Sequence, residues 1–292
     1  MRSRLRTRAA LATLLVALLA AVWFALSVAL LPEPPVPREI LLGGGGVCLI
    51  LFAVIGGLAI IEARALRLAE ERMRRFLADA SHELRTPIAG VQASAEIVLR
   101  TDPGRAEREK LVLQILREAH RAGRLVDDLL AMTRLEQGIP LAIEPFDLVP
   151  LTAAAVELTR ELAPGVTIHL HAPGHSPLHG DPHRIRQVLD NILSNARHAT
   201  PDGGQITVRV SDQAAEAQIE VIDTGPGIPQ PDRERIFERF TRLASTYPSG
   251  ANGNGLGLAI ARGIANAHSG TLTCADPAGG GARFVLRLPR RS

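Results

Sequence analysis

The sequence predicts a chain of three parts: two transmembrane helices, a helical hairpin that pairs into a four-helix bundle, and an α/β domain. Three observations lead to this prediction. Two uncharged apolar runs lie near the amino terminus, apolar residues with a helical repeat occupy residues 66–136, and helix and strand patterns alternate over residues 145–290. A chain of 292 residues is long enough for a packed domain with additional segments.

The first part, residues 1–61, is predicted to be a membrane region. Its two uncharged runs, 9–31 and 40–61, are each long enough to cross about 30 Å of hydrocarbon. The first run exceeds the apolar core of about 7–15 residues in a signal peptide, so we expect it to be retained. Arginines precede the first run and follow the second, and basic residues favour the cytoplasmic side of a membrane. This arrangement predicts a multi-pass inner-membrane protein with both termini in the cytoplasm. The external loop, 32–39, is too short for a sensing domain.

A helical linker, 62–75, is predicted to lead into a dimerisation hairpin over residues 68–140. Leu77, Leu84 and Val91 recur every seven residues along its first helix. A break at TDPGRA separates this helix from a second one over residues 107–136, which also has one apolar side. Two such helices leave too much apolar surface exposed, so we expect a homodimer in which they form a four-helix bundle.

The stretch SHELRTPI places a histidine and a glutamate shortly before a proline within the first helix. An interior proline costs roughly 3 kcal/mol, so Pro87 predicts a weakened turn at which the helix can bend. At about 100° per residue, His82 and Thr86 lie on one face, away from Leu84. Taken alone, His82 could equally be a solvated surface residue next to Glu83.

The third part, residues 141–292, contains a helix with two amides on one face. Asp181 followed by Pro182 predicts its start, because an acidic N-cap and a proline at the first position favour a helix. The same helix carries Asn191 and Asn195, four residues apart. They are either a buried polar pair or oxygen ligands for Mg²⁺.

Two glycine-rich segments follow predicted strands at 205–210 and 218–222. The second strand ends in DTGPGIP, where Asp223 offers a carboxylate acceptor and the following glycines permit close approach of a ligand to the backbone. Farther along, GNGLGLAIARG leads directly into a helix, whose exposed N–H groups favour phosphate oxygens. Each segment alone is a weak signal.

Together these motifs resemble a known family. ADASHELRTPI at 78–88 resembles the phosphoacceptor box of sensor histidine kinases, and LLAMTRLEQG at 129–138 resembles the end of their second helix. The helix with the two asparagines, DTGPGIP, RIFERF and GNGLGLAIARG resemble the N, G1, F and G2 boxes of their ATP-binding domains. The resemblance covers residues 68–290. It implies an α/β sandwich of the GHKL (Bergerat) type, with a mixed five-stranded sheet and ATP under a mobile lid.

The resemblance also implies a reaction and its participants. The γ-phosphoryl group of ATP would pass to His82, with Glu83 orienting or deprotonating the imidazole, and then to an aspartate of a cognate response regulator. Thr86 would serve dephosphorylation of that regulator, Asp223 would bind the adenine amino group, and Asn195 and Asn191 would hold Mg²⁺. The implied ATP-binding residues are Asn191, Asn195, Arg197, His198, Asp223, Gly225, Gly227, Ile228, Phe240, Gly253, Gly255, Leu256 and Gly257.

Three positions depart from the family pattern. His198 and Ala199 stand where the family usually has a basic residue and then Tyr or His, and Arg197 is a candidate substitute for the missing phosphate contact. Ala282 stands where a threonine often supports the adenine. We therefore expect nucleotide affinity to be lower than the motifs suggest.

Alternative functions are a GHKL ATPase of the gyrase type and a degenerate receptor that binds ATP without transferring phosphate. Nucleic acid is not expected as a partner, because the net charge of +3 resides in residues 1–61 and the remainder is balanced. For the input, we hypothesise a stimulus within the bilayer, sensed through membrane lipids or a partner membrane protein on the glycines at 43–46. Constitutive activity is the alternative.

Overall fold

The computed structural model describes residues 38–138, 140–213, 215–243, 254–277 and 280–290, with side chains from residue 54 onward except at 72, 136 and 137. The chain divides into two compact units, residues 1–75 and 76–292. The predicted span at 9–31 and most of the loop at 32–39 lie outside the described residues. Among the residues that are described, no helix combines the length and apolarity needed to cross a bilayer.

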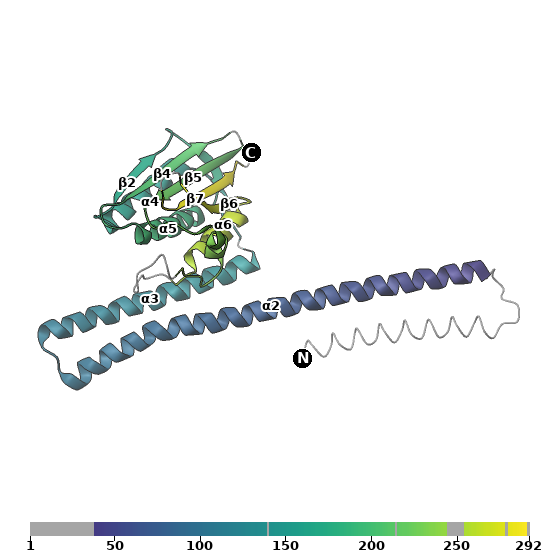
Figure 1. Ribbon diagram of the computed structural model, residues 1–292, viewed down its shortest axis with the longest axis horizontal. Coiled ribbons are helices and arrows are strands. Elements are labelled where there is room, and N and C mark those ends of the chain that lie inside the picture. Colours follow the sequence, from purple (N-terminus) through teal and green to yellow (C-terminus); the bar gives the residue numbers. More distant parts are fainter. Residues whose placement is uncertain (1–37, 139, 214, 244–253, 278–279, 291–292) are drawn as a thin grey trace. The chain divides into compact units, whose positions relative to one another are not determined.

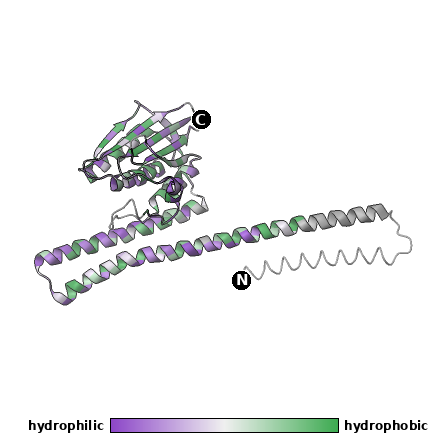
Figure 2. Cartoon of the chain, viewed as in Figure 1, coloured by the Kyte–Doolittle hydropathy of each residue, from purple (hydrophilic) through white to green (hydrophobic). Residues whose placement is uncertain are grey.

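The helical hairpin consists of α2 (Arg38–Thr101) and α3 (Arg105–Gln137), joined by a three-residue turn. Helix α2 includes the predicted second span and linker, and it remains helical through Pro87, so the expected weak turn does not interrupt it. Helix α3 ends at Gly138, which has a φ of 81°. The predicted second helix, 107–136, is thus confirmed to within about two residues, whereas the first helix begins well before residue 66. Polar and apolar residues are interleaved along both helices (Figure 2).

The α/β domain is built on the predicted mixed five-stranded sheet, with strand order β2-β4-β5-β7-β6. Only the pair β2–β4 is parallel, and the other neighbours run antiparallel, with Val208 opposite Val221 in the central β4–β5 pair. The strands are β2 (Thr167–His171), β4 (Gln205–Asp212), β5 (Glu216–Asp223), β6 (Thr271–Ala275) and β7 (Arg283–Pro289). A separate antiparallel pair consists of β1 (Glu144–Asp147) and β3 (Pro177–Gly180).

Three helices lie on one side of the sheet (Figure 1): α4 (Leu148–Leu162), α5 (Pro182–Ala199) and α6 (Gly257–Ala267). Side chains alternate between the two faces of β5, so its apolar residues meet the helices while its polar residues face away. On that polar face Glu220 lies near Arg209 and Arg283. Two single-turn 3-10 helices, η1 (Gln230–Asp232) and η2 (Arg235–Phe237), follow β5.

The start of α5 is set by the predicted cap. The Asp181 carboxylate accepts a hydrogen bond from the Arg184 N–H at 3.1 Å, and Pro182 occupies the first helical turn. The other oxygen of Asp181 accepts from the Ala142 N–H at 3.1 Å. One acid therefore fixes both the helix that carries Asn191 and Asn195 and the segment that enters the α/β domain.

Candidate active site

Asp223, at the end of β5, is a buried carboxylate with one satisfied and one unsatisfied oxygen. Asp223 is only 1% exposed. Oδ1 accepts hydrogen bonds from the Gly225 N–H at 2.9 Å and the Ala282 N–H at 3.1 Å. Oδ2 is buried and has no partner among the described residues. Burial raises the pKa of Asp223, although the two N–H groups act in the opposite direction. Asp223 thus has one acceptor available to a ligand.

The glycines around Asp223 are required by close backbone packing. A Cβ on Gly225 would lie 2.6 Å from the Ala199 carbonyl oxygen. Gly227 has a φ of 76°, and a Cβ there would lie 2.8 Å from the Gly281 oxygen. The sequence predicted that these glycines allow a ligand to approach. In the structure it is the protein's own backbone that approaches them, and the ligand contact stays a prediction.

Helix α5 supplies one wall of a cavity of about 320 Å³. Asn191, Ser194, Asn195 and His198 all line it, as the shared face of the two asparagines predicted. The Asn191 Nδ2 atom is buried and has no hydrogen-bond partner among the described residues. A Cβ on Gly257, at the start of α6, would lie 3.3 Å from Asn191 Oδ1, so this glycine brings the helix start close to the amide.

His198 and its neighbour Arg197 differ in their relation to the cavity. The His198 Nδ1 lies 2.6 Å from the Ser194 carbonyl oxygen, and its Nε2 lies 3.2 Å from Arg197 Nη2. Burial lowers the pKa of His198, and the nearby charge of Arg197 lowers it further. Arg197 is not among the residues that line the cavity. Its predicted role as a substitute phosphate contact therefore has no support from this cavity.

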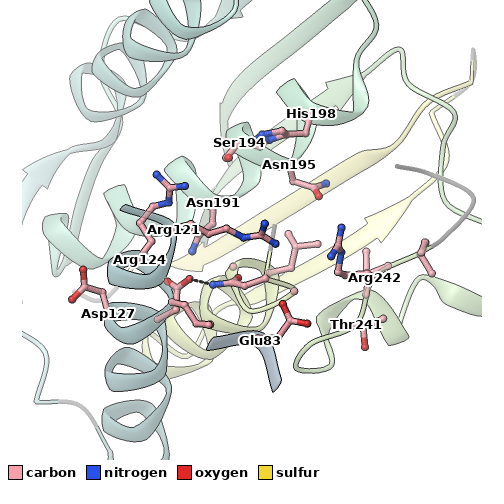
Figure 3. Close-up of a pocket in the computed structure, with 18 of the residues that line it drawn as sticks. Glu83, Arg121, Arg124, Asp127, Asn191, Ser194, Asn195, His198, Thr241 and Arg242 are labelled. Carbon is pink, nitrogen blue, oxygen red and sulfur yellow. Dashed lines mark hydrogen bonds between the residues drawn. The ribbon is translucent and has the colours of Figure 1, made fainter. Parts of the chain in front are cut away.

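The opposite wall of the cavity comes from the hairpin (Figure 3). Helix α2 contributes Glu83, and α3 contributes Arg121, Arg124, Asp127 and Asp128. Residues of α3 and α5 that are more than 60 positions apart in the sequence therefore face the same space.

One hydrogen bond joins the hairpin to the segment before α6. Asn254 Nδ2 donates to Asp128 Oδ2 at 2.6 Å, while Asn254 Oδ1 accepts from the Leu256 N–H at 3.1 Å. Burial raises the pKa of Asp128, and the hydrogen bond from Asn254 acts against that shift. Both residues line the cavity.

The phosphoacceptor candidate itself lies outside the cavity. His82 and Thr86 are both exposed while Leu84 is half-buried, which confirms the predicted orientation of this face. Glu83, the residue next to His82, does line the cavity. The structure therefore brings Glu83 together with Asn191 and Asn195, and it leaves the imidazole one residue away on the surface.

The base of the predicted lid packs against the hairpin. Phe240 has a φ of 59°, unusual for a residue other than glycine, and its ring centroid lies 6.0 Å from that of Phe76 on α2. The Arg239 guanidinium lies over the same Phe76 ring at 5.3 Å. A Cβ on Gly255 would lie 2.7 Å from the Phe240 carbonyl carbon, which explains the glycine. Ile228 and Leu256 are buried nearby. Gly253 and the rest of 244–253 lie outside the described residues.

Two family descriptions match the chain. Residues 72–138 match the His Kinase A (phospho-acceptor) domain, and residues 180–292 match the histidine kinase-, DNA gyrase B- and HSP90-like ATPase. The chain belongs to the sensor histidine kinases.

Relatives of this sensor histidine kinase agree with that assignment. The probable sensor histidine kinase TcrY of Mycobacterium tuberculosis is 37% identical over 222 residues, 76% of this chain and 46% of TcrY. The histidine-protein kinase/phosphatase MprB of Mycobacterium sp. (strain KMS) is 32% identical over 239 residues, 78% of this chain and 46% of MprB. The chain thus spans about half the length of these relatives.

Two solved structures are similar to the fold. Full-length ShkA in complex with AMPPNP has a TM-score of 0.56 at 28% identity, covering 75% of this chain and 46% of ShkA. The Acinetobacter baumannii histidine kinase AdeS has a TM-score of 0.57 at 25% identity, covering 72% of this chain and 98% of the AdeS chain.

Several cavity residues of this sensor histidine kinase were missed by sequence reasoning. Arg242 follows the RIFERF segment by only two positions, so its proximity to a recognised motif was a usable signal. Arg121 and Asp128 are seven residues apart and thus share a face of α3. Nothing in the sequence indicated that this face would meet α5.

Proposed function

We propose that the chain is a membrane-bound sensor histidine kinase that phosphorylates itself on His82 with ATP and passes the phosphoryl group to an aspartate of a cognate response regulator. One observation carries this proposal: a single cavity is lined by Glu83, next to His82, and by Asn191 and Asn195 of the ATPase-like domain. The two domains of the family are thereby arranged around a common space.

ATP fits the α/β domain through Asp223. Its buried Oδ2 has no partner among the described residues, and a carboxylate oxygen of this kind is suited to accept a hydrogen bond from the adenine amino group. A buried acceptor left without a partner costs about 1–3 kcal/mol, which a bound adenine would offset. The similar protein ShkA was solved with AMPPNP, an ATP analogue.

Mg²⁺ fits the amides of α5. Asn191 and Asn195 both line the cavity, and each side chain carries an amide oxygen. Amide oxygens are suitable ligands for a small hard cation. When bound, Mg²⁺ would neutralise part of the phosphate charge.

The transfer step needs one nucleophile and one base. A neutral ring nitrogen of His82 attacks the γ-phosphorus, the bond from that phosphorus to the bridging oxygen breaks, and ADP leaves with the bonding electrons. Glu83 accepts the proton that the imidazole loses. His82 lies one residue outside the cavity, so its side chain has to move toward Glu83. Pro87, whose nitrogen cannot donate a helical hydrogen bond, makes that turn easier to bend.

The same hairpin is proposed to form the homodimer and the phosphatase site. Leu116, Val126 and Leu130 of α3 are 44–52% exposed, and a second copy would cover them. Thr86 is exposed one turn from His82, where its hydroxyl can orient a water against a docked aspartyl phosphate. The relative MprB is named a kinase/phosphatase, which supports both activities.

The membrane location is proposed from the sequence. The apolar runs 9–31 and 40–61 would span the inner membrane with both termini in the cytoplasm, and the input would act through lipids or a partner membrane protein. Replacing the loop 32–39 by a Gly/Ser loop would then leave the response intact. Replacing the four glycines at 43–46 by leucine would alter it.

The decisive experiment compares two exposed histidines of the hairpin. In the full chain, His82→Gln is expected to abolish acid-labile, alkali-stable phosphate from radiolabelled ATP while nucleotide binding survives. His120→Gln is the matched control, because His120 is also exposed on the hairpin and does not line the cavity. Comparable labelling of the His82 variant would exclude it as the acceptor. A wild-type chain without acid-labile phosphate would favour the receptor or the ATPase instead.

A further inference from the structure

Arg121 of α3 is a half-buried cation in the cavity. It lines the space that Asn191 and Asn195 line from the other side (Figure 3). In the described part of the chain its guanidinium has no hydrogen bond and no ion pair. An arginine presents five N–H donors in a planar fork that matches the oxygens of a phosphate. Arg121 is therefore suited to bind an anion that enters the cavity.

Helix α5 contributes no positively charged side chain to the same cavity. Asn191, Ser194 and Asn195 are neutral, and His198 has a pKa lowered by burial from an ordinary value near 6.5. The charges of Arg197 and Arg124 lower it further, so at neutral pH the imidazole is uncharged. The position at which related proteins usually have a basic residue thus carries no charge here.

Other charged groups also line the cavity. Asp128 accepts the hydrogen bond from Asn254, and Arg124, an exposed residue, lies close enough to influence both Asp128 and His198. Arg242 already interacts with another group of the protein. The carboxylates Glu83, Asp127 and Asp128 also face the cavity, and without a cation they would repel a triphosphate.

We propose that Arg121 is a phosphate-binding residue that the hairpin contributes to the ATP site, where it contacts the γ-phosphate during transfer. The inference rests on the proposed kinase function and deepens it. Phosphoryl transfer proceeds mostly by positioning and charge stabilisation, and negative charge spreads over the equatorial oxygens of the transferred group. Arg121 would reach that group only when the hairpin and the α/β domain lie together. Arg121 would thereby couple domain contact to the rate of transfer.

The test uses the full chain and measures two quantities, the initial rate of acid-labile labelling at saturating ATP and the dissociation constant of ADP. Arg121→Ala is expected to lower the rate about 100- to 1,000-fold, as for loss of one preorganised donor to a transition state. The ADP dissociation constant is expected to stay unchanged, because ADP lacks the phosphate that Arg121 contacts. Arg121→Lys should restore part of the rate, since it keeps the charge but not the planar fork.

The matched control is Arg117→Ala. Arg117 lies one turn earlier on α3, is exposed and does not line the cavity, so its variant should keep the wild-type rate. A wild-type rate for Arg121→Ala would overturn the proposal while leaving the kinase function intact. Equal weakening of ADP binding and of the rate would also overturn it, because that pattern indicates general damage to the site. A wild-type chain without acid-labile phosphate would overturn both proposals.

Discussion

The α/β domain and the helical hairpin differ in how completely one chain buries their apolar residues. In the α/β domain, Leu189, Ile260 and Phe284 have exposures of 0%, and the sheet and helices enclose a continuous core. On α3, by contrast, Leu116 and Leu130 remain 50% and 52% exposed. They belong to a stripe with the spacing of a helical seam, which also includes Val112, Ala119, Gly123 and Val126. The α/β domain is complete within one chain, whereas the hairpin is not.

This difference separates the two halves of the proposed reaction. The adenine acceptor and the amides belong to the complete domain, so nucleotide binding should survive changes in the hairpin. His82 and Arg121 belong to the incomplete part, so phosphoryl transfer should depend on how the hairpin is assembled and docked. The predictions below test this separation.

The largest effect is expected for Gly281→Ala in the α/β domain. Gly281 has a φ of 88°, and a Cβ there would lie 1.8 Å from the Asp223 carbonyl oxygen. The strand end that carries Asp223 would have to shift, at a cost of about 3 kcal/mol or more in the free energy of unfolding. Urea unfolding and nucleotide binding measure the loss. Gly280→Ala is the control, because its φ of 85° is similar but nothing lies within 4 Å. Gly280→Ala should lower the free energy of unfolding by only about 1 kcal/mol. An equal loss for the two variants would show that the close contact of Gly281 with Asp223 is not the cause.

The second prediction concerns the seam of the hairpin. Leu116→Glu places a charge in the surface that the second copy is expected to cover, so the dimer dissociation constant should rise at least about 100-fold, or about 3 kcal/mol. Leu162→Glu provides the comparison, because Leu162 is 59% exposed on α4 of the α/β domain. Sedimentation in detergent should show dissociation for the first variant alone. ADP binding should be the same for both, and dissociation by the Leu162 variant would place the seam elsewhere.

The smallest effect is expected at the hydrogen bond between Asp128 and Asn254. Asp128→Ala removes the acceptor that Asn254 contacts at 2.6 Å, and a contribution of about 1 kcal/mol corresponds to roughly a fivefold lower labelling rate. Asp128→Asn keeps an oxygen that can accept the same hydrogen bond and should retain most of the rate. If both variants lose the rate equally, the charge of Asp128 matters and not its hydrogen bond.

The sequence predicted those features that depend on neighbouring residues. The cap at Asp181, the glycines that follow Asp223 and the exposed face of His82 all follow from local geometry or helical spacing. Arg121 and Asp128 could not be placed in the same way, because their role depends on contact between α3 and segments more than 60 residues farther along the chain. Ala282 shows the same limit. The sequence shows that its side chain departs from the family pattern, but only the structure shows that its backbone N–H donates a hydrogen bond to Asp223.

Phe76 ties the position of α2 to the segment that follows η2. Its ring contacts Phe240, whose backbone conformation is one that a side chain-bearing residue holds only where its surroundings fix it. A slide of α2 by one residue along the helical path would move that ring by about 1.5 Å and turn it by about 100°. Phe240 would then lose the neighbour that holds it. A signal arriving through α2 would therefore reach Phe240 by a mechanical route that is separate from its route to His82.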